Sequence, residues 1–467
     1  ANNNKINWYP DTIRTGRFGK FLENVIDWGI SRDRYWGTPL PVWKCECGHE
    51  ECIGSIAELK EKAIDCPNEI ELHKPYIDNV HLKCPKCGKE MTRFKEVIDC
   101  WFDSGSMPFA QLHYPFENKE EFEKHFPAQF ISEAIDQTRG WFYTLLAVST
   151  CLFDKPSYEN CIVLGHVLDE HGQKMSKSKG NGVDPIRAVE RFGADAIRYW
   201  AGSANLGYDT PYSEDTISKG QKLITKLFNS AKFAELNFDK LNNEILTPVD
   251  DIKNGLIFET IDKWIISKTR TAMENVTKSF EKFDYSKALE LIEDLFWNDF
   301  CDNYLEIAKI RCYGATGFKY QDKELSDTEV DVINKSQQSG VRTIYYVFNA
   351  ILKMFAPFVP TICDEIYSCI YENEFSKNKS ISARGTWPKF NDFVNDFDAE
   401  KIGEVAKNIL AEVRKYKSDK NISIKEIIDN INVYCDTDLI SVVEDLKNVC
   451  NVNNISFMKS NEFKIEF

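Results

Sequence analysis

The spacing of apolar and polar positions changes along the chain, and each pattern predicts a different kind of structure. From Phe130 to Trp200, short apolar runs at residues 128–135 and 161–168 alternate with segments of helical periodicity at residues 140–153 and 184–203. Strands that alternate with helices at this spacing are typical of a parallel α/β unit. We therefore expect a parallel sheet with helices packed against it in this part of the chain.

Longer helical patterns follow from residue 213 to about residue 390. In residues 261–283 and 285–312, apolar residues recur every three or four positions, which predicts an α-helical bundle. After residue 393, one helical segment stands among strand-like pieces and predicts a small α/β appendage. The first 128 residues are irregular and carry two close cysteine pairs. The predicted architecture is multidomain α/β plus all-α, divided at residues 1–128, 129–212, 213–392 and 393–467.

Composition narrows the class of protein. A chain of 467 residues is too long for one core, and no run of about 18 apolar residues predicts a membrane span. Fifteen cysteines without a regular framework are typical of a reduced, cytosolic protein, and the N-terminus shows no secretory signal. The net charge of −15 argues against general nucleic-acid affinity. A chain with this net charge can still carry a local basic face that binds phosphate.

The two cysteine pairs predict a metal site. Cys45 and Cys47 precede one glycine, and Cys84 and Cys87 precede another, so each pair lies on a tight turn. Two such turns can supply a closed tetrahedral Zn²⁺ site with four thiolate ligands, which has no open position for catalysis. The first pair has one spacer residue instead of two, so His49 and Cys52 are alternative ligands. The competing interpretation is four unrelated reduced cysteines.

A loop rich in lysine and serine, residues 172–185 (GQKMSKSKGNGVDP), predicts an anion site. It follows the strand-like run 161–168 and precedes a helix with Asp184 as N-cap and Pro185 at the first position. It therefore lies at the carboxyl end of a strand, where α/β proteins bind ligands. Its small residues, Ser176 and Ser178 among them, allow backbone N–H groups to approach an anion. The competing interpretation is an exposed basic hairpin without a ligand.

Residues 174–178 of this loop (KMSKS) resemble the second signature of the class I aminoacyl-tRNA synthetases. The resemblance implies that the loop stabilises the triphosphate of ATP, bound with Mg²⁺, while an amino-acid carboxylate attacks the α-phosphate. Pyrophosphate leaves and an aminoacyl-adenylate forms, and positioned ammonium groups neutralise the developing charge. Lys174 and Lys177 are the two signature lysines, and Lys177 is expected to make the essential ATP contact.

Two further segments, residues 99–105 (DCWFDSG) and 133–141 (EAIDQTRGW), resemble the isoleucine and valine enzymes of this class. The resemblance implies that Glu133, Asp136 and Gln137 contact the adenylate. It also implies that Trp101 and Trp141 wall a pocket for a branched aliphatic side chain, which indole faces bury well. The competing interpretation places both tryptophans in an ordinary core. Ala134 departs from the glycine that is common at this position, which weakens any backbone contact there.

The resemblance covers nearly the whole chain. The residues before the loop resemble isoleucine enzymes and those after it valine enzymes, so the amino acid, isoleucine or valine, and its partner, tRNA(Ile) or tRNA(Val), stay open. It implies that residues 1–128 are a connective region of the catalytic domain, 129–212 the second half of its Rossmann-type fold, 213–392 the anticodon-binding domain and 393–467 a small C-terminal α/β domain. The His-Ile-Gly-His signature and the editing insertion do not occur.

We therefore expect the carboxyl-terminal part of a synthetase: a fragment, a split-gene product or a composite, with a separate N-terminal half as an expected partner. Alone, the chain is expected not to activate amino acids at a useful rate, and ATP–pyrophosphate exchange by the isolated chain would contradict this. Two alternatives stay open: a synthetase-derived protein that binds tRNA without catalysis, and another adenylyl-transferring enzyme of the same nucleotide-binding class.

In this family, the helices after the catalytic domain recognise the anticodon stem and loop. The resemblance implies two groups of RNA contacts. One is a basic helix face that would contact the phosphate backbone, and the other is a cluster that would stack on unpaired bases. They are Lys219, Lys222, Lys226 and Lys232, and Arg311, Tyr313, Phe318 and Tyr320. Singly, each of these residues is also compatible with a solvated helix face or a core position.

Overall fold

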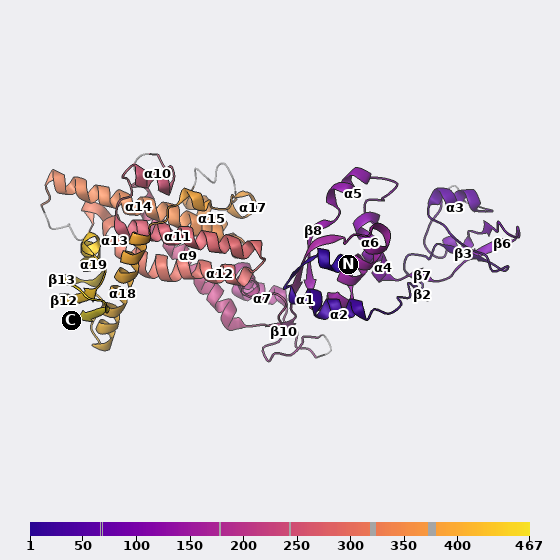
Figure 1. The fold of residues 1–467 in the computed structure, drawn as a ribbon, viewed down its shortest axis with the longest axis horizontal. Helices are drawn as coiled ribbons and strands as arrows, with labels where there is room; N and C mark the ends of the chain where they lie inside the picture. The colour runs from indigo at the N-terminus through magenta and orange to yellow at the C-terminus, as the bar shows by residue number, and fades with distance from the viewer. Residues whose placement is uncertain (66, 68, 177–178, 242–243, 318–323, 372–379) are drawn as a thin grey trace. The chain divides into compact units, whose positions relative to one another are not determined.

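The computed structural model describes residues 1–467 except 66, 68, 177–178, 242–243, 318–323 and 372–379 (Figure 1). The chain forms two compact units. The first contains residues 1–166 and 206–209, and the second contains residues 167–205 and 210–467. Among the described residues, no helix combines the length and the apolar composition that crossing a bilayer requires.

A parallel three-stranded sheet organises the first unit. Its strand order is β1 (Asn7–Tyr9), β9 (Tyr158–Leu164) and β8 (Ala128–Ala134), with Trp8 and Ile131 both in register with Cys161 of the central strand. The apolar run in β9 is buried because it is covered on both faces, as is typical of a central parallel strand. Helix α6 (Trp141–Phe153) contributes Phe142 to the same core. The predicted parallel α/β unit is confirmed.

The cysteine pairs belong to a small antiparallel sheet in the same unit. Its strand order is β4 (Glu50–Cys52), β3 (Val42–Cys45), β6 (Glu90–Arg93) and β5 (Leu82–Lys83), flanked by α3 (Ile56–Lys62). Trp43 is buried in its core and donates its indole N–H to the Val80 carbonyl at 2.8 Å. The remaining elements of the unit are η1 (Asn2–Lys5), α1 (Thr12–Thr15), α2 (Arg17–Glu23), β2 (Ser31–Arg32), η2 (Ile77–Asn79), β7 (Val97–Ile98), α4 (Cys100–Ala110), α5 (Lys119–His125) and η3 (Ile135–Arg139).

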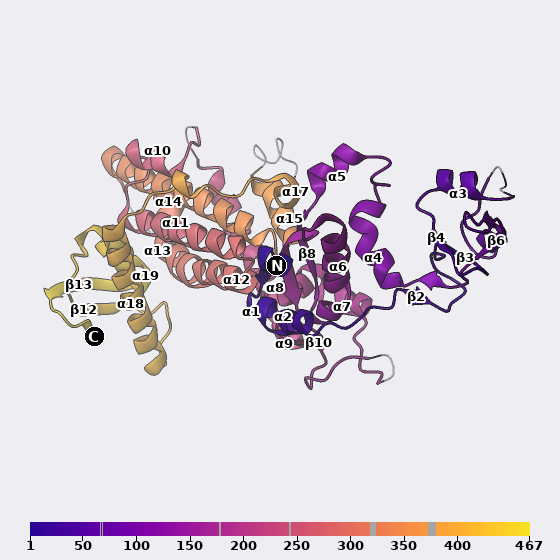
Figure 2. The same cartoon turned by 45° about the vertical axis from the view of Figure 1, so that its right-hand side comes forward.

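The second unit is mostly helical, and its helices pack side by side in both views (Figures 1 and 2). The predicted helix at 285–312 is present as three consecutive helices. They are α12 (Tyr285–Glu293), the π-helix η4 (Asp294–Tyr304) and α13 (Leu305–Tyr313). The other elements up to residue 392 are β10 (Val167–Leu168), α7 (Pro185–Phe192), α8 (Ala194–Gly202), β11 (Thr210–Pro211), α9 (Glu214–Phe238), α10 (Pro248–Lys253), α11 (Thr260–Glu281), η5 (Gly314–Thr316), α14 (Asp327–Phe355), α15 (Pro360–Ile370), α17 (Ile381–Arg384) and η6 (Phe390–Asp392).

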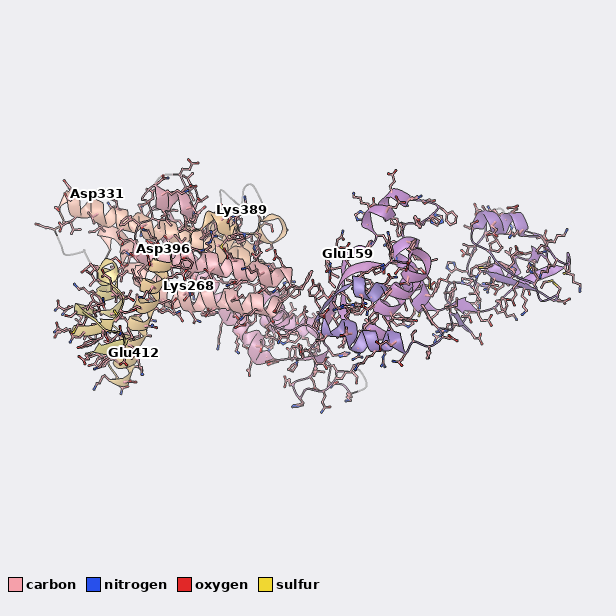
Figure 3. All side chains as sticks on the ribbon, in the orientation of Figure 1. Glu159, Lys268, Asp331, Lys389, Asp396 and Glu412 are labelled. Atoms are coloured by element: carbon pink, nitrogen blue, oxygen red, sulfur yellow. The ribbon has the colours of Figure 1, made fainter. Side chains whose placement is uncertain are left out.

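The C-terminal residues add further helices and a small sheet to this unit. In the sheet, β12 (Ile428–Cys435) pairs in parallel with β13 (Val452–Lys459) and antiparallel with β14 (Lys464–Glu466). Helix α18 (Phe397–Asp419) precedes them, and η7 (Ile440–Val442) and α19 (Val443–Cys450) connect β12 to β13. Asp396 caps α18 (Figure 3), and its backbone N–H donates to Ser267 Oγ of α11 at 2.8 Å. The cap therefore ties the start of α18 to the bundle.

The contact between α18 and α11 depends on a glycine. A Cβ atom at Gly403 would lie 2.2 Å from Cγ of Trp264, which is fully buried, so no larger residue fits without moving the indole. We expect Gly403→Ala to destabilise the helical unit by about 3 kcal/mol, near the upper end for overpacked cores. Urea unfolding followed by circular dichroism measures this loss.

The matched control is Glu412→Ala on the exposed face of the same helix (Figure 3), for which the expected change is below about 0.5 kcal/mol. Equal unfolding midpoints for Gly403→Ala and the unsubstituted chain would contradict the packing described here.

Candidate functional site

The segment predicted to contact an adenylate forms the turn between β8 and α6. Glu133 and Asp136 are exposed at the carboxyl end of the strand. The Gln137 amide bridges the turn, because its Nε2 donates to Asp136 Oδ2 at 2.9 Å and its Oε1 accepts from the Trp141 backbone N–H at 3.0 Å. The structure thus presents two carboxylates, one of them held by a neighbouring amide, where parallel strands usually bind ligands.

Trp101 and Trp141 come from different helices and both adjoin the same turn, although Trp141 packs against the apolar core that contains Phe142. Trp101 lies in the first turn of α4 and keeps 41% of its surface exposed, which argues against an ordinary core position. A Cβ atom at Gly140 would lie 3.0 Å from Cη2 of Trp101 and 2.8 Å from Gln137 Oε1. The indole therefore lies against the turn that begins at Gln137, beside Trp141.

Asp99 holds the start of α4 in place. It is almost fully buried, and its carboxylate accepts from the Trp101 backbone N–H and from Trp28 Nε1, both at 3.0 Å, and forms an ion pair with Arg32. Burial raises the pKa of Asp99, but these hydrogen bonds and the Arg32 charge outweigh it and hold the pKa below its usual range. Asp99 was not predicted from the sequence, since its side-chain partners Trp28 and Arg32 are 71 and 67 residues away in the chain.

His166 is a second residue that the sequence analysis missed. It follows β9, and its ring lies between two carboxylates, with Nε2 3.5 Å from Asp136 Oδ1 and Nδ1 3.2 Å from Asp209 Oδ1. No signal in the sequence could have found it, because His166 lies inside the strand-like run predicted at 161–168, whereas the observed strand β9 ends at Leu164.

The loop rich in lysine and serine belongs to the second unit, and an asparagine at its end hydrogen-bonds to residues at its start. Asn181 Nδ2 donates to Asp169 Oδ2 at 2.8 Å and to the Lys174 carbonyl at 3.3 Å, and its Oδ1 accepts from the Ser176 backbone N–H at 2.9 Å. Met175 packs against the apolar cluster that contains Phe192. Lys174 is exposed, whereas the predicted site residues Lys177 and Ser178 lie outside the described residues.

Two hydrogen-bonded ends define this loop. Hydrogen bonds lower the pKa of Asp169, first that from the backbone N–H of Gln173 and then that from the side-chain amide of Asn181. The carboxylate therefore stays ionised as an acceptor. At the other end, Asp184 Oδ1 accepts from the Ile186 backbone N–H at 3.0 Å and Pro185 begins α7, as predicted.

The four predicted metal ligands converge. The Sγ atoms of Cys45, Cys47, Cys84 and Cys87 all lie within 4.8 Å of one another, with separations of 3.4 Å between Cys45 and Cys87 and 3.7 Å between Cys47 and Cys84. Neither of the alternative ligands belongs to this cluster, although both are described. The structure therefore favours the four-thiol set over the alternatives named from the sequence.

The two turns that carry these cysteines are each closed by a backbone hydrogen bond and end in a glycine with a positive φ. In each turn, the N–H of the glycine donates to the carbonyl of the first cysteine at 2.9 Å, and Gly48 and Gly88 have φ values of +85° and +74°. Burial raises the pKa of the Cys84 thiol, but backbone hydrogen bonds from Cys87 and Lys86 outweigh it and lower the pKa to about 7. The backbone of this turn thus favours the thiolate of Cys84. For Cys45, a backbone hydrogen bond from Cys47 is outweighed by burial and the neighbouring thiols, which raise the pKa of Cys45 to about 12.

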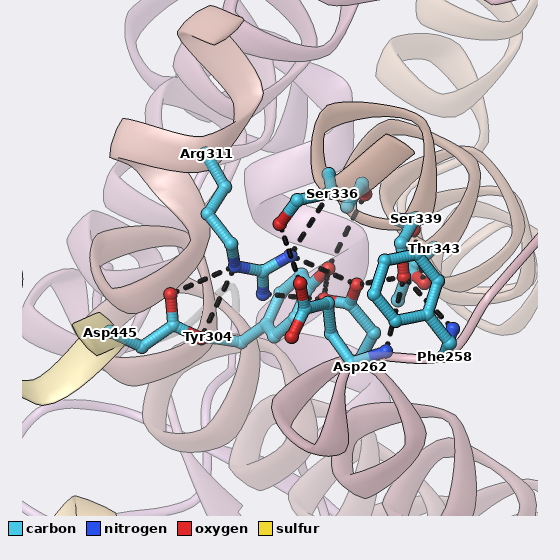
Figure 4. A network of polar contacts seen from close by, with 10 residues as sticks. Phe258, Asp262, Tyr304, Arg311, Ser336, Ser339, Thr343 and Asp445 are labelled. Carbon is cyan, nitrogen blue, oxygen red and sulfur yellow. Dashed lines mark hydrogen bonds and ion pairs between the residues drawn. The ribbon is translucent and has the colours of Figure 1, made fainter. Parts of the chain in front are cut away.

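The predicted RNA contacts divide into two groups. Lys219, Lys222 and Lys232 are exposed on α9, whereas Lys226 pairs with Asp302 at 3.4 Å. The expectation for Arg311 is wrong, because this side chain is buried among acidic partners instead of facing RNA (Figure 4). Phe318 and Tyr320 lie outside the described residues, and Tyr313 is half-buried.

The Arg311 network joins three helices (Figure 4). Its guanidinium donates to Asp262 of α11 and Asp445 of α19, at 2.9 Å in each case. Asp262 is fully buried and also accepts from Tyr304 Oη at 2.9 Å and Ser339 Oγ at 2.6 Å. The charge of Arg311 is therefore satisfied inside the protein.

Comparison with known proteins identifies two family matches. Residues 1–213 match the family described as tRNA synthetases class I (I, L, M and V), and residues 262–431 match the anticodon-binding domain of tRNA ligase. The isoleucine–tRNA ligase of Clostridium novyi is 51% identical over 91% of this chain, and that of Clostridium tetani is 47% identical over 100% of this chain. The chain spans 39% and 43% of the length of these two relatives.

Solved structures show the same fold at lower identity. Agrobacterium radiobacter LeuRS, in a ternary complex with tRNA and LeuAMS, is 22% identical with a TM-score of 0.53, and the match covers 82% of this chain and 45% of that one. Mycobacterium tuberculosis methionyl-tRNA synthetase, in complex with methionyl-adenylate, is 18% identical with a TM-score of 0.52, over 82% of this chain and 62% of that one.

Proposed function

This chain belongs to the class I aminoacyl-tRNA synthetases, a family that uses ATP. We propose that it is part of an enzyme that activates isoleucine and transfers it to tRNA(Ile) in the cytoplasm. The observation that carries the proposal is the turn at Gln137, where an ordered carboxylate, the Trp101 indole and the start of α6 at Trp141 come together. Isoleucine is preferred over valine because the relatives that cover nearly the whole chain are named isoleucine–tRNA ligases.

In the proposed reaction, the carboxylate of isoleucine attacks the α-phosphate of ATP. A new carboxyl–phosphate bond forms, the bond to the β-phosphate oxygen breaks, and pyrophosphate leaves. Glu133, Asp136 and Gln137 present hydrogen-bond acceptors and a donor to the adenylate, and the indoles of Trp101 and Trp141 exclude water from its apolar side chain. Lys174 and Lys177 offset the phosphate charge, together with Mg²⁺. The small side chains of Ser176 and Ser178 let backbone N–H groups of the loop approach the phosphates.

We propose that the cluster of Cys45, Cys47, Cys84 and Cys87 holds a structural Zn²⁺. With Zn–S bonds of about 2.3 Å, tetrahedral geometry places sulfurs about 3.8 Å apart. The separations of 3.4 and 3.7 Å are near this value, which supports the fit. Four thiolates leave no position for water, so the ion would stabilise the small sheet without taking part in the reaction.

We also propose that exposed lysines on α9 contact the tRNA backbone. Lys219 and Lys222 line a cavity of about 600 Å³ together with Trp297 of η4. The lysines supply the positive charge that phosphate contacts require, although the whole chain is acidic.

Binding of non-hydrolysable adenylates tests the proposed substrate. We expect isoleucyl sulfamoyl-adenosine to bind the 467-residue chain about 10- to 200-fold more tightly than the valyl analogue. One methylene in an apolar pocket sets this range, a limit for which the isoleucine enzymes are themselves the standard example. Calorimetric titration measures both affinities.

Variants of two apolar residues complete this test. Trp101→Ala should weaken both analogues, whereas Leu152→Ala, which removes an exposed side chain of α6, should leave both affinities unchanged. Equal affinities for the two analogues would reject isoleucine as the preferred substrate, and failure to bind either would reject the adenylate site.

A further inference from the structure

We infer that His166 is a further positioning residue of the proposed adenylate site, because its imidazole holds the carboxylate of Asp136 in place. This inference rests on the proposed function. His166 Nε2 lies 3.5 Å from Asp136 Oδ1, an ion-pair distance, and this nitrogen is buried without a hydrogen-bond partner among the described residues. The carboxylate at this distance is the one predicted to contact the adenylate.

Asp209 determines the orientation of the ring. Asp209 Oδ1 accepts from the His166 backbone N–H at 2.8 Å and lies 3.2 Å from Nδ1 of the same residue. The backbone hydrogen bond from His166 is the main reason that the pKa of Asp209 is low, and the charge of Arg17 also lowers it. Asp209 is therefore an ionised acceptor for Nδ1–H, which directs Nε2 toward Asp136.

Two carboxylates face the imidazole ring. Asp136 lies near Nε2 and Asp209 near Nδ1, and the charge of Arg17 also acts on Asp209. When both ring nitrogens carry a proton, each of them can donate to one carboxylate.

Asp136 transmits this contact to the rest of the turn. One of its oxygens lies near His166, and the other accepts from Gln137 Nε2 at 2.9 Å. Gln137 in turn accepts from the Trp141 backbone N–H at 3.0 Å. His166 thus anchors a chain of contacts that runs from the end of β9 to the first residue of α6, so the carboxylate is ordered before a ligand binds.

Two conservative variants separate this role from a general structural one. In His166→Gln, the side-chain amide reaches approximately as far as Nε2 and can still donate to Asp136. In His166→Asn, the amide reaches only as far as Nδ1 and loses that contact. We expect His166→Asn to weaken isoleucyl sulfamoyl-adenosine binding about tenfold and His166→Gln to retain the affinity within about threefold, measured by calorimetry on the full chain.

A ligand-free measurement tests the contact by itself. The ¹⁵N chemical shift of His166 Nε2, followed by NMR at a fixed pH, should change in Asp136→Asn, because an amide replaces the carboxylate 3.5 Å away. An unchanged chemical shift, or equal affinities for His166→Asn and the unsubstituted chain, would overturn the inference alone. A chain that does not bind the analogue at all would overturn the proposed function, and this inference with it.

Discussion

Replacing Arg311 with methionine is expected to destabilise the helical unit by about 3–5 kcal/mol, the usual cost of removing one partner from a buried ion pair. The loss arises because Asp262 and Asp445 would stay buried without their cation. Urea unfolding, monitored by circular dichroism, measures the change in the free energy of unfolding. The matched control is Lys309→Ala on the same helix, whose exposed pair with Glu306 should contribute less than about 1 kcal/mol.

The pH dependence of this loss identifies its cause. Burial raises the pKa of Asp445 to about 6, and the charge of Arg311 only partly opposes this effect. A carboxyl group whose folded pKa is above its unfolded value stabilises the fold at low pH and loses that contribution as pH rises through the folded pKa. Without Arg311 the pKa of Asp445 should rise further, so the Arg311→Met variant should lose more stability at pH 8 than at pH 5. A loss that is equal at both pH values would show that packing, not charge, explains it.

Replacing Cys84 with serine is expected to abolish zinc binding and unfold the small antiparallel sheet. The unsubstituted chain should contain one Zn²⁺, and the binding energy of a structural zinc site, about 10–16 kcal/mol in isolated zinc-finger peptides, is also folding energy. Metal analysis of the purified protein and limited proteolysis of residues 42–93 measure the two effects. A chelator should reproduce the proteolytic sensitivity in the unsubstituted chain.

Cys52→Ser is the matched control for the zinc prediction. Cys52 ends β4 of the same sheet but does not belong to the four-thiol cluster, so its replacement should leave the zinc content unchanged. If Cys52→Ser lost the metal while Cys84→Ser kept it, the ligand set proposed here would be wrong.

The sequence alone was sufficient for features in which the deciding interactions are local. The strand-like run at 161–168 and the helix start at Asp184 and Pro185 depend on side-chain periodicity and on hydrogen bonds between near neighbours. The helix start is present, whereas the run is divided between β9, which ends at Leu164, and the separate strand β10 at Val167–Leu168. Cys84 and Cys87 were recognisable for the same reason, because the turn that carries them is closed by its own backbone. The family resemblance rested on short motifs of this kind, and the comparisons confirm it.

What the sequence could not supply are contacts between residues far apart in the chain. Nothing near Arg311 in the sequence shows that Asp262 and Asp445 neutralise it, so its expected role in RNA binding was wrong. In the same way, the partners of Asp99 and His166 come from other segments that only folding brings together. The sequence by itself determined the class of protein, its elements and the chemistry of its motifs, because these depend on local order. Only the tertiary structure decided which charges are buried and paired, since burial and pairing depend on distances that local order does not set.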